Sequence, residues 1–248
     1  MKPRFSIIVP AYNEARLLPR LLESIEIAAT RYGRVDVEII VADNFSTDDT
    51  RVIAESMGAK VVSISKRRIA AARNGGASVA SGEILCFIDA DSALHPDTFH
   101  KIDEAMRDNR FIAGATGVYL ERLSLGLLVT YLMMLPMMLI TGMDTGVVFC
   151  RREDFGAVGG YNEELFFAED VAFLQALKRR GAAKQQRLTR LRSVKALGCT
   201  RKFEENGDWH YFPMLLKSLA LLIRKGFSVF IKQDDVPDLT DYWYRPQR

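Results

Sequence analysis

The chain has 248 residues, of which 48% are hydrophobic and 26% charged, so it can bury a large core and is neither a disordered nor a fibrous sequence. The formal net charge of +3 is too small to indicate a nucleic-acid partner. Cys86, Cys150 and Cys199 are odd in number and lack metal-type spacing, so we expect small buried thiols in a reducing compartment.

Strand and helix patterns alternate along the first half of the chain. Short apolar runs predict buried strands at residues 5–9, 37–42, 61–64 and 84–88. Helical periods or small-residue runs predict helices at residues 14–30, 47–57 and 69–80. Pro10 is expected to end the first strand. This alternation predicts an α/β fold, in which helices cover both faces of a mostly parallel sheet.

The second half of the chain is less regular. We expect strands at residues 111–120 and 145–150, and helices at 168–180 and 213–224. Residues 171–203 contain no Asp or Glu but ten cations, which indicates either a solvated face or a surface held toward phosphates or anionic lipid. The sequence shows no internal repeat and no linker, which favours one domain.

Two carboxylates follow the most apolar of the predicted strands. Asp89 and Asp91 come directly after the sequence ILCFI, on a loop at a carboxyl strand end, where open α/β sheets bind ligands. Mn²⁺ and Mg²⁺ prefer hard oxygen ligands and share their remaining positions with water and substrate phosphates. The alternative is an ordinary acidic turn. The position after a buried strand favours a metal site.

Three other positions carry candidate chemistry. Asp43 ends the second predicted strand and is poised to accept hydrogen bonds from a base or ribose, whereas Ser46 to Asp49 fit the start of a helix. Arg73 precedes two glycines and suits a phosphate or a base, or else it is a solvated residue on a packed helix. Asp170, after Glu169, can act as a general base or simply cap a helix.

Four segments in this order resemble glycosyltransferase family 2, whose members have the GT-A fold. The segments are SIIVPAYNE (residues 6–14), VADNFSTDDT (41–50), AARNGGASVASGEILCFIDAD (71–91) and TGVVFCRREDFGAVGGYNEELFFAED (145–170). Each piece alone is loose, but the ordered set is specific. The resemblance implies a metal-assisted, inverting transfer of a sugar from a nucleoside diphosphate to an acceptor. It also implies a nucleotide-binding half (residues 1–91), an acceptor-side half (92–211) and a helical extension (212–248).

The resemblance places roles on individual residues. Asp43 matches the carboxylate that reads the base, typically uracil, and Arg73 the basic residue near base and phosphates. Asp89 and Asp91 match the metal motif, with Asp91 the more direct ligand and Asp89 closer to ribose. Asp170 matches the general base of inverting members, with Glu169 beside it. The loop that lies against the nucleotide is matched by Pro10, Ala11, Tyr12 and Glu14.

The chain departs from the family pattern at two places. Asp43-Asn44-Phe45-Ser46 stands where members often have Asp-Asp-Gly-Ser. The Q-x-x-R-W motif of processive members is missing, so we do not expect processive synthesis. Arg201 and the pair Trp209-His210 are the nearest substitutes, and Arg201 is a candidate substrate-binding residue. Some GT-A enzymes complete the metal shell with a late histidine, a role for which His210 is the candidate.

Residues 123–143 are uncharged and long enough to span a bilayer. Spanning is rejected because the metal motif and Asp170, on either side of the stretch, must share one active site. A buried helix, a homodimer contact or an interfacial segment remains. With the apolar helix at 213–224, the stretch is consistent with a cytoplasmic protein in peripheral contact with the inner membrane surface.

The expected donor is a UDP-sugar, with a GDP-sugar as the alternative, and the expected acceptor is a saccharide or a lipid-linked molecule. Two other functions stay open. A nucleotidyltransferase that makes nucleotide sugars should carry a glycine-rich loop with Arg and Lys after the first strand, whereas residues 10–14 contain no glycine and no basic residue. A catalytically inactive binding module would not need the intact Asp89, Asp91 and Asp170.

Overall fold

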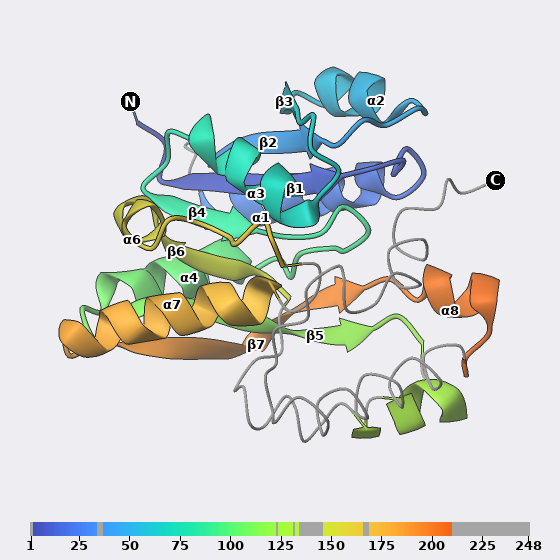
Figure 1. Ribbon diagram of the computed structural model, residues 1–248. Helices are drawn as coiled ribbons and strands as arrows, with labels where there is room; N and C mark the ends of the chain where they lie inside the picture. The colour runs from blue at the N-terminus through green and yellow to red at the C-terminus, as the bar shows by residue number, and fades with distance from the viewer. Residues whose placement is uncertain are drawn as a thin grey trace.

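The computed structural model describes residues 2–33, 37–122, 124–130, 132–133, 146–165 and 169–209. These residues form a seven-stranded sheet with helices on both faces (Figure 1). The strands are β1 (Phe5–Ala11), β2 (Val37–Asp43), β3 (Lys60–Ser63), β4 (Ile84–Phe87), β5 (Phe111–Leu120), β6 (Val148–Arg151) and β7 (Arg187–Gly198). The helices are α1 (Leu18–Tyr32), α2 (Thr50–Ser56), α3 (Ile69–Ser78), α4 (Thr98–Arg107), α6 (Arg152–Ala157), α7 (Glu169–Ala183) and α8 (Arg201–Asn206).

The strand order is β3-β2-β1-β4-β6-β5-β7. The β1–β2, β2–β3, β1–β4 and β5–β7 pairs are parallel, whereas β6 runs antiparallel to both β4 and β5. The predicted α/β class with a mostly parallel sheet is therefore confirmed. The parallel arrangement of β1, β2 and β4 brings their carboxyl ends to one edge of the sheet.

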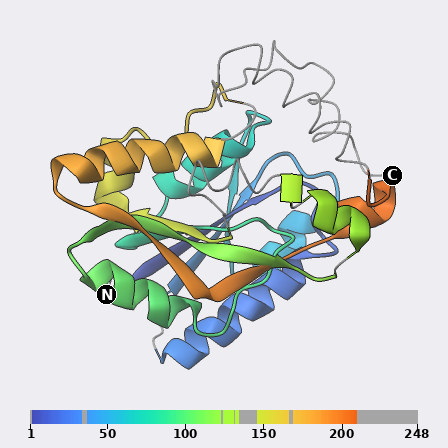
Figure 2. The ribbon, with the colours of Figure 1, turned by 90° about the horizontal axis from the view of Figure 1, so that it is seen from below.

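The core has two layers, one on each side of the sheet. β1 alternates between them: Phe5, Ile7 and Val9 face the layer of α1 and α4, and Ile8 faces the layer of α3 and α7. Figure 2 shows the sheet between these two helix layers. Because both faces are covered at the centre of the sheet, β1 and β4 are buried at every position and almost wholly apolar, rather than alternating with exposed polar residues.

The prediction that Pro10 ends the first strand is wrong. β1 continues to Ala11, and Pro10 pairs with Ala42 of β2. The pairing with β4 stops at Ile8, so the missing N–H of Pro10 lies beyond the part of β1 that has a partner on both sides.

Four elements were not predicted from the sequence, namely α4, α6, β7 and α8. β7 lies in the basic block as an edge strand, with Arg187, Arg192 and Lys195 exposed, as expected for a charged edge that discourages further strand pairing. The block as a whole is divided among α7, β7 and α8. The predicted helix at 213–224 lies outside the described residues, as does most of 123–143.

Small residues let α3 lie close to the sheet. A Cβ on Gly76 would stand 2.5 Å from Cγ2 of Ile8, a methyl group of a fully buried residue in β1. A Cβ on Gly156, in α6, would meet no atom within 4 Å. Substituting each of these two helical glycines therefore distinguishes the effect of close packing on stability from the effect of helix propensity.

We predict that Gly76→Ala lowers the free energy of unfolding by about 1–3 kcal/mol, because the overpacking cost exceeds the gain in helix propensity. Gly156→Ala, which makes the same change without the contact, should be neutral or stabilising by up to about 1 kcal/mol. Urea denaturation of both variants measures the difference. Equal effects at the two positions would show that the close approach of α3 is not what Gly76 provides.

Candidate active site

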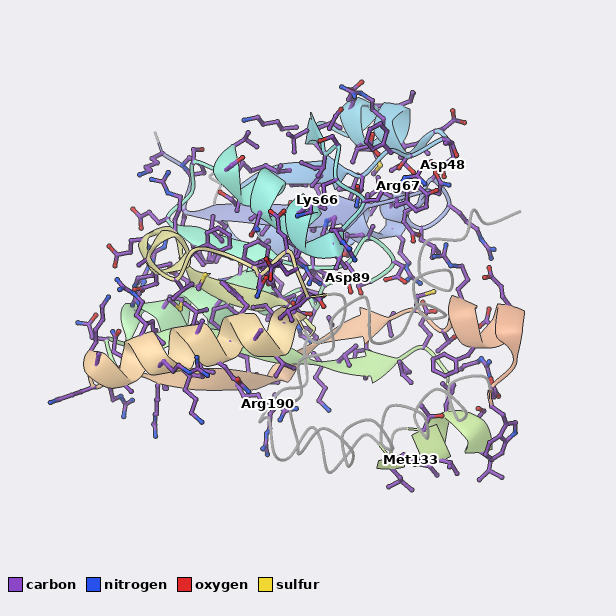
Figure 3. All side chains as sticks on the ribbon, viewed as in Figure 1. Asp48, Lys66, Arg67, Asp89, Met133 and Arg190 are labelled. Atoms are coloured by element: carbon purple, nitrogen blue, oxygen red, sulfur yellow. The ribbon has the colours of Figure 1, made fainter. Side chains whose placement is uncertain are left out.

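The candidate site lies at the carboxyl edge of the sheet. β2 ends at Asp43, and Asp89 follows β4 by two residues. Figure 3 shows Asp89 at the end of β4, with Lys66 and Arg67 above it on the segment between β3 and α3. The guanidinium of Arg67 lies over the ring of Tyr12, 5.5 Å from its centroid. Asp43, Asp89 and the Tyr12 loop thus follow strand ends at the same edge of the sheet.

The loops after β1 and β2 are joined by hydrogen bonds through Asn13. Its backbone N–H donates to Oγ of Ser46 at 3.0 Å, and its Oδ1 accepts from the N–H of Thr47 at 2.7 Å. Asn13 adopts a left-handed backbone with φ 54°, which asparagine tolerates. The expectation that Ser46 or Thr47 caps a helix is therefore wrong, because α2 begins only at Thr50 and both residues bind the neighbouring loop instead.

Asp43 is 6% exposed, and its Oδ1 accepts the backbone N–H of Ser46 at 3.0 Å. Phe45 has φ 64°, the left-handed conformation that glycine adopts most readily. The turn of the Asp-Asp-Gly-Ser pattern is therefore compatible with phenylalanine here, at the cost of backbone strain. The ring of Phe45 is half exposed at the same edge of the sheet.

A single buried guanidinium joins the two sides of the site. Arg73, on α3, is 4% exposed. Its Nη1 donates to Glu169 Oε1 and to Asp170 Oδ1, each at 2.8 Å, and its Nη2 donates to Asp89 Oδ1 at 3.0 Å. Burial alone would lower the pKa of Arg73, but the charges of Asp170 and Asp89 raise it well above its ordinary value. Arg73 is therefore a fixed cation, not the solvated residue of the alternative interpretation.

The surroundings of Arg73 hold the start of α7 in place. The ring of Tyr161 lies under the guanidinium, 5.1 Å from centroid to Cζ, and stacks on Phe173 of α7 with centroids 4.2 Å apart. Asn74 receives the N–H of Tyr161 on its Oδ1 at 2.8 Å and donates to the Tyr161 carbonyl at 2.9 Å. A Cβ on Gly160, which has φ +72°, would lie 2.7 Å from Asn74 Oδ1.

Burial raises the pKa of Asp170 to about 7. The Arg73 guanidinium opposes this shift, and the neighbouring Glu169 and Asp89 carboxylates add to it. A carboxyl group that titrates near neutrality is suited to take and give a proton.

Neighbouring residues of a helix usually point in different directions, yet the side chains of Glu169 and Asp170 meet at one cation. Both carboxylates bind the same Nη1 of Arg73. They occupy the first turn of α7, where acidic side chains also favour the positive end of the helix, and Arg73 lies between them at that end.

Arg201 connects the second half of the chain to the loop after β1. Its Nη2 donates to Glu14 Oε1 at 2.8 Å, with side-chain exposures of 8% and 14%. Burial alone would lower the pKa of Arg201, but the hydrogen bond and charge of Glu14, with the charge of Asp91, raise it. Arg20 donates to the backbone carbonyl of Asp91 at 2.6 Å and so fixes the loop after β4.

The carboxylates after β4 fit a divalent cation only in part. Asp89 is 53% exposed and Asp91 stands two residues further along the same loop, which suits Mn²⁺ or Mg²⁺ held by one or two carboxylates and substrate phosphates. Among the described residues no group of three or more His, Cys, Asp and Glu could hold an ion by itself. His210, the predicted third ligand, lies outside them.

The structure also bears on the apolar stretch. Within the described part of the chain, no helix is both long and apolar enough to cross a bilayer. Most of residues 123–143 lies outside that part, so the choice among buried helix, dimer contact and interfacial segment stays a prediction.

The chain belongs to glycosyl transferase family 2, whose model matches residues 6–132, slightly more than half of the chain. Validoxylamine A glucosyltransferase of Streptomyces hygroscopicus subsp. jinggangensis is 39% identical over 100 residues, which are 38% of this chain and 23% of that protein. This relative is thus matched over about a quarter of its length.

Solved structures have the same fold. A mannosyltransferase from Pyrobaculum calidifontis in complex with GDP-Man and Mn²⁺ has a TM-score of 0.68 at 20% identity and covers 98% of this chain and 70% of that one. TarS 1–349 of S. aureus in complex with UDP-GlcNAc has a TM-score of 0.60 at 21% identity and covers 81% of this chain and 59% of that one. The resemblance to family 2 and the GT-A fold are therefore confirmed.

Tyr161 and Asn74 were not predicted to be parts of the site. Asn74 was visible only as the neighbour of Arg73, and Tyr161 as one aromatic residue after two glycines. Their roles depend on the contact between α3 and the segment before α7, which are 87 residues apart in the chain.

The raised pKa of Asp170 has a consequence for stability. A folded-state pKa above the unfolded value favours the native state only while the carboxyl is protonated. We therefore predict that the wild-type protein loses unfolding free energy relative to Asp170→Asn as pH rises from 4 to about 7. Urea denaturation of both proteins across this range tests the sign. A difference that stays constant, or grows in favour of the wild type, would contradict the raised pKa.

Proposed function

We propose that this protein transfers a sugar from a nucleoside diphosphate sugar to an acceptor hydroxyl, with inversion at the anomeric carbon. The observation that carries the proposal is the cluster at Arg73. One guanidinium there binds both Asp89, on the donor side, and Asp170, at the start of α7. The cluster puts a carboxylate that can take a proton close to the edge where family 2 members carry their metal motif.

The donor side is formed by the edge of β1, β2 and β4. Asp43 is the residue proposed to read the base, and Tyr12, with Pro10, Ala11 and Glu14, forms the loop against the nucleotide. A UDP-sugar is favoured and a GDP-sugar is the alternative; solved relatives of similar fold carry UDP-GlcNAc in one case and GDP-Man with Mn²⁺ in another. Arg201, which holds Glu14, is proposed to fix this loop when the donor binds.

The proposed reaction is a displacement at the anomeric carbon of the donor sugar. The acceptor oxygen attacks the anomeric carbon from the side opposite the diphosphate, and Asp170 takes the hydroxyl proton. The bond from the anomeric carbon to the diphosphate oxygen breaks, and its electron pair leaves with the nucleoside diphosphate. Asp89 and Asp91, with His210 as a further candidate, would hold Mn²⁺ or Mg²⁺, which supplies charge neutralisation for the leaving diphosphate.

The acceptor is proposed to be a saccharide or a lipid-linked molecule, bound by the half of the chain after residue 91. Peripheral contact with a membrane surface and a homodimer are the two further proposals for the apolar residues 123–143. Family membership does not favour a nucleotidyltransferase, and the intact carboxylates do not favour an inactive binding module.

A panel of donors tests the proposal directly. The protein is incubated with UDP-glucose, UDP-GlcNAc, GDP-mannose or ADP-glucose, with Mn²⁺, Mg²⁺ or EDTA, and released nucleoside diphosphate is measured. Metal-dependent release from a uridine or guanosine donor is expected. Release of pyrophosphate from a nucleoside triphosphate and a sugar phosphate, and no release from any nucleotide sugar, would point to the nucleotidyltransferase instead.

We predict that Asp91→Asn lowers metal-dependent release by at least about 100-fold, because it removes the most direct metal ligand while keeping the side-chain volume. Asp97→Asn, which changes a partly exposed carboxylate that pairs with Arg31 before α4, is the matched control and should leave turnover unchanged. Near-normal turnover of a folded Asp91→Asn protein would refute the assignment.

Asp43 should act mainly on donor binding. We predict that Asp43→Ala raises the donor KM more than it lowers kcat, because contacts to the base are the same in the ground state and the transition state. Calorimetry with UDP and ADP should show preference for UDP in the wild type and its loss in the variant. Equal wild-type affinity for the two nucleotides would remove the basis for this role.

A further inference from the structure

Arg73 has two kinds of partner, and they lie on opposite sides of the proposed reaction. Its Nη2 binds Asp89, beside the donor, and its Nη1 binds Asp170 and Glu169, at the start of α7. We propose that Arg73 is a positioning residue for the base: its guanidinium holds Asp170 at a fixed place relative to Asp89. The inference rests on the proposed function, but it replaces the role near base and phosphates that the family resemblance implies for Arg73.

The occupancy of the guanidinium supports this role. Both terminal nitrogens of Arg73 are engaged by carboxylates in the described residues, at distances of 2.8 to 3.0 Å. Nη1 carries two N–H groups, and Glu169 and Asp170 occupy both, so a bond from Nη1 to a diphosphate requires one of these ion pairs to open. The planar fork of arginine can bind Asp89 with one nitrogen and Asp170 with the other, a geometry that the single ammonium of lysine does not reproduce.

The packing around Arg73 makes it a rigid support. Its side chain is 5% exposed and lies on the ring of Tyr161, which stacks in turn on Phe173 of α7. The next residue, Asn74, binds both backbone groups of Tyr161. Close packing at Gly75 and Gly76 fixes this part of α3 against the side chains of Ile64 and Ile8. A movement of Arg73 would therefore disturb the segment that precedes α7.

The position of a base matters more to the transition state than to donor binding. A general base must reach about 2.6–3.2 Å from the oxygen that it deprotonates. If Arg73 sets that distance, its loss lowers kcat and leaves nucleotide affinity nearly unchanged. If Arg73 instead binds the diphosphate, its loss weakens the nucleotide first.

The test compares Arg73→Lys with the wild type, using the sugar donor that turns over in the panel above. Arg73→Lys should lower kcat by about 100-fold, within the range of general acid–base effects, because lysine keeps the charge but not the fork. The dissociation constant of UDP, measured by calorimetry with EDTA present, should change by less than about threefold.

Arg180→Lys is the matched control. Arg180 lies on α7 as well and pairs with a buried carboxylate, Asp154, at 2.7 Å, but it stands eleven residues after the start of the helix. Arg180→Lys should keep both kcat and UDP affinity. This control separates the general effect of weakening an arginine's pair with a buried carboxylate from the positioning effect.

A double-mutant cycle shows whether Arg73 acts through Asp170. Asp170→Asn alone should lower kcat by about 10²–10⁴-fold. Adding Arg73→Lys to Asp170→Asn should cost less than about threefold more, because the group that Arg73 positions has already lost its function. Additive losses would overturn the proposal, as would a rise in the UDP dissociation constant with kcat unchanged.

Thermal unfolding establishes that each variant is folded at the assay temperature. Should Arg73→Lys unfold, the comparison is made between Arg73→Lys/Glu169→Gln and Glu169→Gln, because removing one carboxylate relieves the excess negative charge, and the same loss of kcat is expected. If the wild-type protein turns over no nucleotide sugar, the proposed function is wrong. If the wild type is active and Arg73→Lys weakens only nucleotide binding, the proposed function stands and the positioning role of Arg73 is wrong.

Discussion

A buried positive charge on α3 organises the site. Three carboxylates, Asp89, Glu169 and Asp170, share the guanidinium of Arg73, and the ring of Tyr161 lies under it. Removing one partner of a buried ion pair typically costs about 3–5 kcal/mol, because the remaining charges lose their compensation. The end of β4 and the start of α7 therefore depend on one cation for their local charge balance, although 81 residues separate Asp89 from Asp170.

The topology of the sheet brings the partners of Arg73 together. Parallel pairing aligns the ends of β1, β2 and β4, and α3, between β3 and β4, packs on the face that α7 also covers. Glycines on α3 allow the close approach, and the bonds of Asn74 to Tyr161 join α3 to the segment before α7. On the donor side, Asn13 and the Glu14–Arg201 pair fix the loop after β1. The proposed chemistry thus rests on loops that are held by specific polar contacts, several of them partly buried.

Local sequence patterns were enough to predict the apolar strands, the α/β class and the strand-end carboxylates, because each depends on a few neighbouring residues. β7 was missed because its cations at an exposed edge mask the alternation expected of a half-buried strand. Pro10 was misjudged because its tolerance depends on where β4 stops. The Arg73 cluster was not predicted, since it needs the relative placement of α3 and α7. Neither did the sequence show that Phe45 takes the left-handed backbone of a glycine.

The central claim is that donor and base meet across the Arg73 cluster at the carboxyl edge of the sheet. A crystal structure of the protein with UDP and Mn²⁺ tests this most directly. The account predicts uracil beside Asp43, the diphosphate at the loop of Asp91, and Asp170 still bound to Arg73 on the far side of the sugar position. A nucleotide bound away from this edge, or an Arg73 that has left Asp170 to bind the diphosphate, would contradict it.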